Sequence, residues 1–184
     1  MNLLLRCLDA EPNSAHRALA SLSLPSTLSR IAPSLDSQYS PPLLITQNMD
    51  SLSLRTLASF PADAKAAAED RILEMHGSIF VTRCTSCQHS QRSYAASLSH
   101  ALTNPEVRDI SISELPRCGG EGWAGGNRYG SCGGLLRPGV IWFGEVPDHM
   151  GEIARRLNWC DLLLIVGTSS TVSSAIYGVE GLLM

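Results

Sequence analysis

Four cysteines in the middle of the chain constrain its fold more than any other feature. Cys84 and Cys87 are separated by two residues, a spacing that lets both thiolates reach one tetrahedral zinc ion across a tight turn. Cys118 and Cys132 follow, each beside two glycines whose flexible backbone can bring the thiolates to the same ion. Because zinc held by four thiolates has no open coordination position, we expect a structural metal and not a catalytic one.

Two alternatives to the four-thiolate site remain open. Thirteen residues separate Cys118 from Cys132, so His89 could replace one cysteine as a ligand, or all four could be free thiols. Cys7 and Cys160 lack metal-ligand spacing, and we expect them to be structural. The apolar run at the start of the chain is too short for a secretory signal, so these cysteines indicate an intracellular, soluble protein rather than a disulfide framework.

Charge and hydropathy exclude several classes of partner. The net charge is -3 with 14 lysines and arginines in 184 residues, which leaves no basic stripe for direct nucleic-acid binding. No segment is long and apolar enough to span a bilayer, so we expect no membrane partner. A small molecule or a peptide is the expected partner.

Two short apolar runs predict an α/β fold. Residues 43–46 and 162–166 have the composition of buried parallel strands, and residues 12–24 and 147–160 have helical spacing. The Ser- and Pro-rich stretch 21–42 predicts a loop. Residues 84–134, rich in Gly, Ser and Cys, predict a small inserted zinc module between two parts of one larger domain, 1–83 and 135–184.

Polar residues follow each predicted strand, where ligand sites of α/β sheets lie. Gln47, Asn48, Met49 and Asp50 follow the first strand and could bind ribose hydroxyls and an amide, although Asp50 could equally cap the next helix. Small residues suited to a nucleotide follow the second strand: Gly167, Thr168, Ser169 and Ser170. His76 is a candidate acid-base residue only because of these surroundings.

The stretch 137–145, RPGVIWFGE, combines an extended run with glycines at its ends. It predicts an exposed edge that a peptide could join by β-addition. Packing of Trp142 and Phe143 in the core is the alternative.

Together and in this order, these segments resemble the sirtuins. The matching segments are PNSAHRAL at 12–19, ITQNMD at 45–50, EMHGS at 74–78, CTSC at 84–87, CGGLLRPGVIWFGE at 132–145 and DLLLIVGTSS at 161–170. The wording HGSIFVTRCTSC, LPRC and VIWFGE is most similar to the class III branch, whose members prefer acidic acyl groups such as succinyl, malonyl and glutaryl.

The resemblance implies a Rossmann-like NAD domain with an inserted zinc module. It also implies an NAD-dependent protein-lysine deacylase that transfers the acyl group of an acyl-lysine protein or peptide to ADP-ribose and releases nicotinamide. On the family pattern, His76 is the general base, the residues Gln47 to Asp50 and Gly167 to Ser170 bind NAD, and the four cysteines hold structural zinc. The substrate peptide would pair with Val140, Ile141, Trp142, Phe143, Gly144 and Glu145. By the same resemblance, the compartment is mitochondrial, cytosolic or nuclear.

The sequence departs from the family pattern in three places. The printed chain contains no Gly-rich GAGxS segment before Pro12, and it stops soon after Ser170, so we expect an incomplete Rossmann-like sheet whose activity depends on the missing parts. The residues that select acidic acyl groups belong to that missing stretch. Ser51 and Ser53 replace a Gly or Glu and a His. A non-enzymatic, zinc-stabilised module that binds a protein or peptide is therefore the alternative function.

Overall fold

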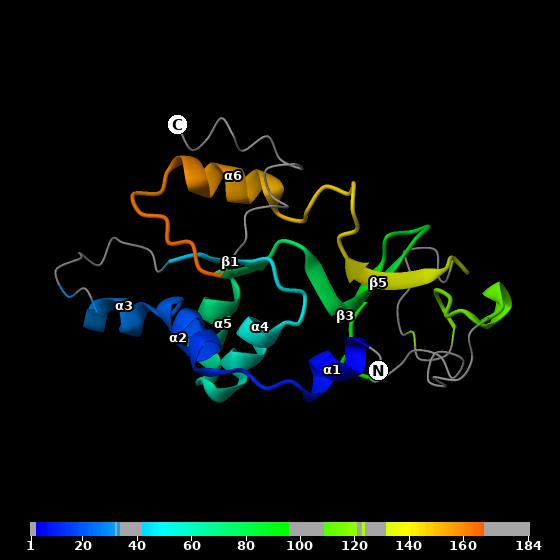
Figure 1. Cartoon of the computed structure of the whole chain (residues 1–184), viewed down its shortest axis with the longest axis horizontal. Helices are drawn as coiled ribbons and strands as arrows, with labels where there is room; N and C mark the ends of the chain where they lie inside the picture. Colours follow the sequence, from blue (N-terminus) through cyan, green and yellow to red (C-terminus); the bar gives the residue numbers. More distant parts are fainter. Residues whose placement is uncertain are drawn as a thin grey trace.

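The computed structural model describes residues 3–31, 33, 42–95, 109–120, 123 and 132–167 (Figure 1). Its α-helices are α1 Leu3–Asp9, α2 Ser14–Leu22, α3 Pro25–Ile31, α4 Leu52–Thr56, α5 Ala62–Glu69 and α6 Met150–Asn158. Its strands are β1 Leu44–Thr46, β2 Ile72–Glu74, β3 Gly77–Cys84, β4 Ser90–Arg92 and β5 Leu136–Val140. Short 3-10 helices lie at Leu57–Ser59 and Ile112–Glu114. No helix in these ranges is long and apolar enough to cross a membrane.

Two sheets organise these elements. β1 and β2 run parallel, with Leu44 opposite Ile72 and Thr46 opposite Glu74. The chain between them forms α4 and α5, and such a helical crossover is the usual connection between parallel strands. The second sheet is antiparallel in the order β4-β3-β5. The predicted α/β class and the strand at 43–46 are therefore confirmed.

Helix α2 begins where the sequence predicts. Asn13 accepts a hydrogen bond from the backbone N–H of His16 at 3.1 Å and caps the first turn. Its fully buried Ala20 packs in a core with Leu57, Ala68 and Ile72, which places α2 against the helical crossover. In Figure 1, α2 lies beside α4 and α5, below the β1 strand.

The predicted loop over 21–42 is wrong for its first part. α2 continues to Leu22, and Pro25–Ile31 forms helix α3. Proline fits the first position of a helix because the N–H it lacks has no partner there and its φ is already helical. The prolines therefore start a helix instead of excluding one. Residues 34–41 lie outside the described residues.

Helix α6 covers one face of the parallel pair. Its buried Ile153 packs with Leu73 and Met75 of the β2 segment, and Leu43 and Ile45 of the β1 segment join the same cluster. The helix begins at Met150, so Pro147 and Asp148 of the predicted helix lie before it. Figure 1 shows α6 above β1, on the side opposite α2.

The second predicted parallel strand does not form. Residues 162–166 have no strand assignment and are exposed, with Leu162 at 86% and Val166 at 61%. A strand is stable only when a neighbour accepts its backbone hydrogen bonds, and no strand of the described chain pairs with this segment. An apolar run predicts burial against a neighbouring strand. Within the described residues, no strand pairs with residues 162–166.

Candidate functional site

The four cysteines of the predicted zinc module meet at one point. Their Sγ atoms lie within 4.8 Å of one another. The Sγ atoms of Cys84 and Cys132 are 3.4 Å apart, and those of Cys87 and Cys118 are 3.8 Å apart. A tetrahedron with Zn–S bonds of about 2.3 Å has S–S edges of about 3.8 Å. The cluster therefore fits a structural zinc ion.

Backbone contacts of the glycines bring the two halves of this cluster together. The N–H of Cys118 donates to the carbonyl of Gly134 at 2.9 Å, and Gly133 donates back to the carbonyl of Cys118 at 3.2 Å. A Cβ atom at Gly134 would lie 2.5 Å from the Ser86 hydroxyl and 2.9 Å from Cys84 Sγ. A side chain at position 134 would displace Ser86 and the Cys84 thiol, so the glycine at this position favours the close approach.

His89 is not a ligand. Its ring packs edge-on against Trp123, with the ring centroids 5.4 Å apart, and its carbonyl accepts the N–H of Cys84 at 2.8 Å. The histidine therefore supports the turn from outside the thiol group. Of the remaining cysteines, Cys7 is buried and Cys160 is exposed.

The cluster favours a cation. Burial raises the pKa of Cys84, but N–H groups of Cys87 and Ser86 outweigh it and lower that pKa to about 7. The N–H of His89 lowers the pKa of Cys87, but lost solvation and the neighbouring sulfurs outweigh it and raise that pKa to about 12. Sulfurs as close as those of Cys84 and Cys87 do not both carry a negative charge near neutral pH without a cation beside them. A dication is what allows four thiolates to coexist.

A second group of side chains gathers where β1 and β2 end. Because the strands are parallel, their carboxyl ends share one edge, where residues 47–50 follow β1 and His76 follows β2. His76 Nδ1 lies 3.0 Å from the Gln47 carbonyl oxygen. A carbonyl only accepts, so Nδ1 carries the proton and Nε2 has a free lone pair. The half-buried ring is thus held in the tautomer suited to a base.

The loop formed by residues 47–50 is anchored through its backbone and leaves side chains open to solvent. The N–H of Ile79 donates to the Met49 carbonyl at 2.9 Å, and the N–H of Asn48 donates to Thr46 Oγ1 at 3.1 Å. Gln47, Asn48 and Met49 are exposed. Asp50 Oδ1 accepts the N–H of Leu52 at 3.0 Å at the start of α4. The interpretation of Asp50 as the N-cap of α4 is wrong, because Ser51 holds that position and Asp50 contacts the first helical residue from one position earlier.

The stretch 140–145 joins this edge through β5. Val140 lies opposite Gly77, and the N–H of Ile141 donates to the His76 carbonyl at 2.9 Å. Gly77 has a φ of +69°, and a Cβ there would lie 2.0 Å from the Gly139 carbonyl oxygen. The glycine after His76 is therefore required for β5 to approach the histidine.

Beyond β5 the stretch turns instead of staying extended. The N–H of Glu145 donates to the Trp142 carbonyl at 2.9 Å, and Glu145 Oε2 accepts the N–H of Trp142 at 3.0 Å. The guanidinium of Arg137 pairs with Glu145 at 2.9 Å and lies 5.1 Å from the centre of the Trp142 ring. Trp142 is 55% exposed and Phe143 is 95% exposed, so the core-packing alternative is wrong for both.

The predicted nucleotide loop after residue 166 is only partly placed. Gly167 is exposed with a φ of +68°, and Thr168, Ser169 and Ser170 lie outside the described residues. Within the described residues, no hydrogen bond or ion pair joins Gly167 to His76. The structure thus brings together His76, residues 47–50 and residues 140–145.

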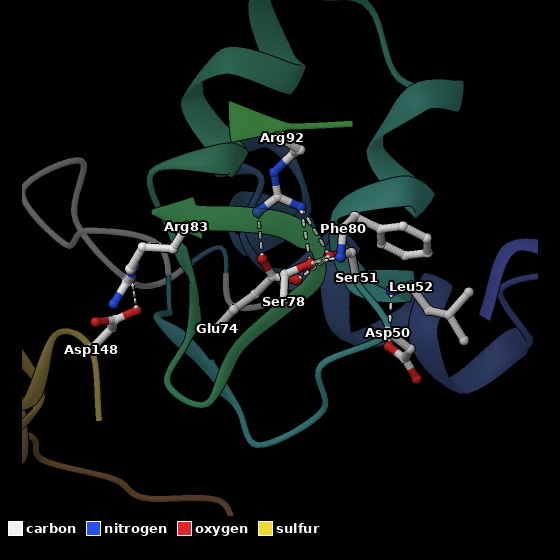
Figure 2. A network of polar contacts seen from close by, with 9 residues as sticks. All are labelled: Asp50, Ser51, Leu52, Glu74, Ser78, Phe80, Arg83, Arg92 and Asp148. Carbon is white, nitrogen blue, oxygen red and sulfur yellow. Dashed lines mark hydrogen bonds and ion pairs between the residues drawn. The ribbon is translucent and has the colours of Figure 1, made fainter. Parts of the chain in front are cut away.

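Sequence reasoning missed a buried polar network around Ser51, which Figure 2 shows. It consists of Ser51, Glu74, Ser78 and Arg92, and we call it the Ser51 network. The one signal in the sequence is Ser51 itself, which stands where the family pattern has Gly or Glu. Its partners could not be foreseen because they lie on three separate segments.

Comparison with known proteins places these two sites in a family. A model described as the Sir2 family matches residues 2–174. The chain belongs to the Sir2 family. It is 38% identical over 177 residues to the NAD-dependent protein deacylase sirtuin-5, mitochondrial, of Canis lupus familiaris, and 36% identical over 177 residues to that of Xenopus tropicalis. These alignments cover 91% of this chain and 48% of each relative, so the chain spans about half the length of the curated relatives it matches.

Solved Sir2 structures share the fold. A complex of a Sir2 homologue with NAD matches with a TM-score of 0.55 at 30% identity, covering 93% of this chain and 49% of that one. A mutant Sir2 homologue in complex with ADP ribose matches with a TM-score of 0.57 at 30% identity, covering 94% and 52%. The Rossmann-like assignment with a zinc-binding cysteine cluster is confirmed by these neighbours and by the thiol geometry.

Proposed function

We propose that this Sir2 chain carries the base and substrate side of an NAD-dependent protein-lysine deacylase. The observation that carries the proposal is the bond between His76 Nδ1 and the Gln47 carbonyl, beside a loop whose side chains are open to solvent. NAD, when bound, would supply the ADP-ribose that accepts the acyl group, with nicotinamide as the leaving group. Relatives named as NAD-dependent deacylases support this substrate class.

Each residue of the site would have its own role in the proposed deacylation. His76 Nε2 would take a proton from a ribose hydroxyl, because Nδ1 is already committed to Gln47. The amides of Gln47 and Asn48 would bind the ribose, and Asp50 would bind the nicotinamide carboxamide. Gly167 to Ser170 would contact the adenosine side. The exposed loop and the polar edge fit such a ligand.

The acyl-lysine peptide would lie along β5 and the turn after it, from Val140 to Glu145. β5 is an edge strand of its sheet, and beyond Leu136, whose N–H donates to the Pro116 carbonyl at 3.0 Å, its outer backbone groups can pair with an added strand. The bond from Ile141 to the His76 carbonyl would bring that peptide to the base. We also propose an intracellular site of action, in keeping with the mitochondrial designation of the relatives.

Turnover in the presence of NAD tests the proposal. The zinc-loaded chain is incubated with NAD and an acetyl- or succinyl-lysine peptide, and nicotinamide and deacylated peptide are quantified by mass spectrometry. We expect equal amounts of both products, and a loss of at least about 100-fold in His76→Ala with little change in melting temperature. Inactivity that persists when a GAGxS segment is supplied upstream would contradict the proposal.

The exposed Trp142 and Phe143 beside an open strand edge favour one alternative, a non-enzymatic zinc-stabilised module that binds a peptide. Such a module would bind acyl-lysine peptide without NAD. A melting temperature that falls on zinc chelation but does not respond to NAD or ADP-ribose would favour this alternative.

A further inference from the structure

The Ser51 network joins the loop after β1, the segment 74–78 and strand β4 (Figure 2). Ser51 Oγ donates to Glu74 Oε1 at 2.5 Å and lies 2.7 Å from Ser78 Oγ. Ser51 is 2% exposed, Ser78 is 1% exposed and Glu74 is 8% exposed. A carboxylate and two hydroxyls buried to this degree need partners, and here each one partners the others.

Two partners of Ser51 lie on either side of His76 in the sequence. Glu74 lies two residues before the histidine and Ser78 two residues after it. The single hydroxyl of Ser51 therefore bonds to both sides of the bend that presents His76. Ser51 also directly follows Asp50, so the same hydroxyl fixes the end of the loop whose carbonyl at Gln47 orients the histidine ring.

Arg92 completes the network from the zinc module. Its Nη2 atom pairs with Glu74 Oε2 at 2.8 Å, and its Nη1 atom donates to Ser51 Oγ at 3.0 Å. Strand β4, which carries Arg92, leaves the Cys84–Cys87 turn and pairs with β3, where Arg92 lies opposite Val81. The guanidinium therefore balances the buried carboxylate and connects the zinc module to the bend.

The backbone of Ser51 shows that its position is imposed. Its φ of 53° lies in the left-handed region, which a side chain other than glycine adopts only against strain. Residues held in such conformations persist where the surroundings over-determine them, often at functional sites. At Ser51 the surroundings are the three polar partners of its hydroxyl, so those bonds outweigh the strain.

We propose that Ser51, Glu74 and Arg92 are positioning residues that hold the His76 ring against the Gln47 carbonyl and so keep Nε2 available as a base. None of the three contacts the substrate, and each acts through the bend or the loop. The inference rests on the proposed role of His76.

The test observes the His76 ring directly. The zinc-loaded chain is labelled with 15N-histidine, and the tautomer of His76 is read from two-bond 1H–15N correlations, with His76→Asn used to assign the signal. In the parent we expect the Nδ1–H form. In Ser51→Ala and Arg92→Met we expect the Nε2–H form that dominates in free histidine.

The choice of variants keeps the result decisive. Ser51→Ala removes the hydroxyl and adds no new group, and it avoids glycine, which the family pattern has at this position. Ser59→Ala and Arg156→Met are the matched controls, because among the described residues the Ser59 hydroxyl bonds to the Thr56 carbonyl and Arg156 pairs with Glu152 on α6. Both controls should keep the parent tautomer.

A folded Ser51→Ala variant with the parent tautomer of His76 would overturn the proposal, because the network would then have a structural role alone. Turnover gives a second readout: kcat should fall about tenfold in Ser51→Ala while the KM for peptide is unchanged, and an unchanged kcat would also overturn it. Absence of turnover in the parent would count against the proposed function alone, since the tautomer still decides the role of the network.

Discussion

At the scale of single residues, contacts between near neighbours in the sequence could be predicted and those between distant segments could not. The spacing of Cys84 and Cys87 predicts a metal site, because two intervening residues let both thiolates reach one ion. Ser51, Glu74 and Arg92 carry no comparable signal, since their contacts exist only after β2, β4 and the loop after β1 have come together. The positive φ of Ser51 is likewise visible only in the structure.

Arg55 offers a residue-scale prediction. Its guanidinium donates to the carbonyls of Cys7 at 2.8 Å and Leu8 at 3.3 Å, near the end of α1. These carbonyls have few intrahelical donors at a helix end, so Arg55→Met leaves them unsatisfied. We expect a loss of about 1–2 kcal/mol in the free energy of unfolding, because bonds from a charged donor are strong but this one is only partly buried.

Urea denaturation of the zinc-loaded chain measures this change. Arg156→Met serves as the control, since that arginine forms an exposed pair within α6 and should cost less than about 0.5 kcal/mol. Equal losses in the two variants would show that Arg55 does not tie α1 to the crossover helices.

At the scale of elements, the prediction depended on whether an element makes its own contacts. The helical spacing of apolar residues predicts α2 and α6, and both helices form. The run 162–166 has the composition of a strand, but a strand also needs a neighbour, which the described chain does not give it. For α3 the sequence predicted a loop where a helix forms. Pro25 does not exclude this helix but occupies its first position.

The zinc module makes a prediction at this scale. Cys84→Ala should release the metal and lower the melting temperature by about 10 °C, which for a chain of this size corresponds to a loss of about 3 kcal/mol. Differential scanning fluorimetry and zinc analysis of the same samples check both effects. Cys160→Ala is the control, since that exposed thiol lies outside the cluster. Retention of one zinc per chain by Cys84→Ala would contradict the assignment.

The turn after β5 should respond to acid. The N–H of Trp142 and the guanidinium of Arg137 lower the pKa of Glu145 below its ordinary value of 4.5. A lowered pKa in the folded chain means that the contact stabilises the turn above the ordinary pKa and is lost as the pH falls through the lowered one. We therefore expect the turn to be intact from pH 8 to 5 and to open only at lower pH.

Tryptophan fluorescence of Glu145→Gln checks this, because Trp142 lies against Arg137. The variant should differ from the parent at pH 7, and the difference should vanish as Glu145 becomes protonated. Glu152→Gln, on α6, should match the parent throughout. A difference that persists after protonation in a folded chain would refute the link.

At the scale of the whole molecule, the order of the segments predicted more than any one of them. The strand at 44–46 and the four-cysteine cluster follow from the sequence and agree with the match to the Sir2 family. The parallel partner of that strand is β2 and not the predicted run 162–166. What could not be predicted is how residues 140–145 meet the histidine, since that contact depends on the close approach at Gly77. The structure brings His76, the exposed loop 47–50 and the end of β5 to one edge.

The destination of the acyl group tests this account most directly. A peptide with a 13C-labelled acyl-lysine is incubated with NAD and the zinc-loaded chain, and the products are followed by mass spectrometry. We predict that the label moves to ADP-ribose, with one labelled acyl group transferred for each nicotinamide released. We predict no transfer by His76→Ala. Label appearing as a free carboxylic acid while NAD stays intact, or equal transfer by His76→Ala, would contradict it.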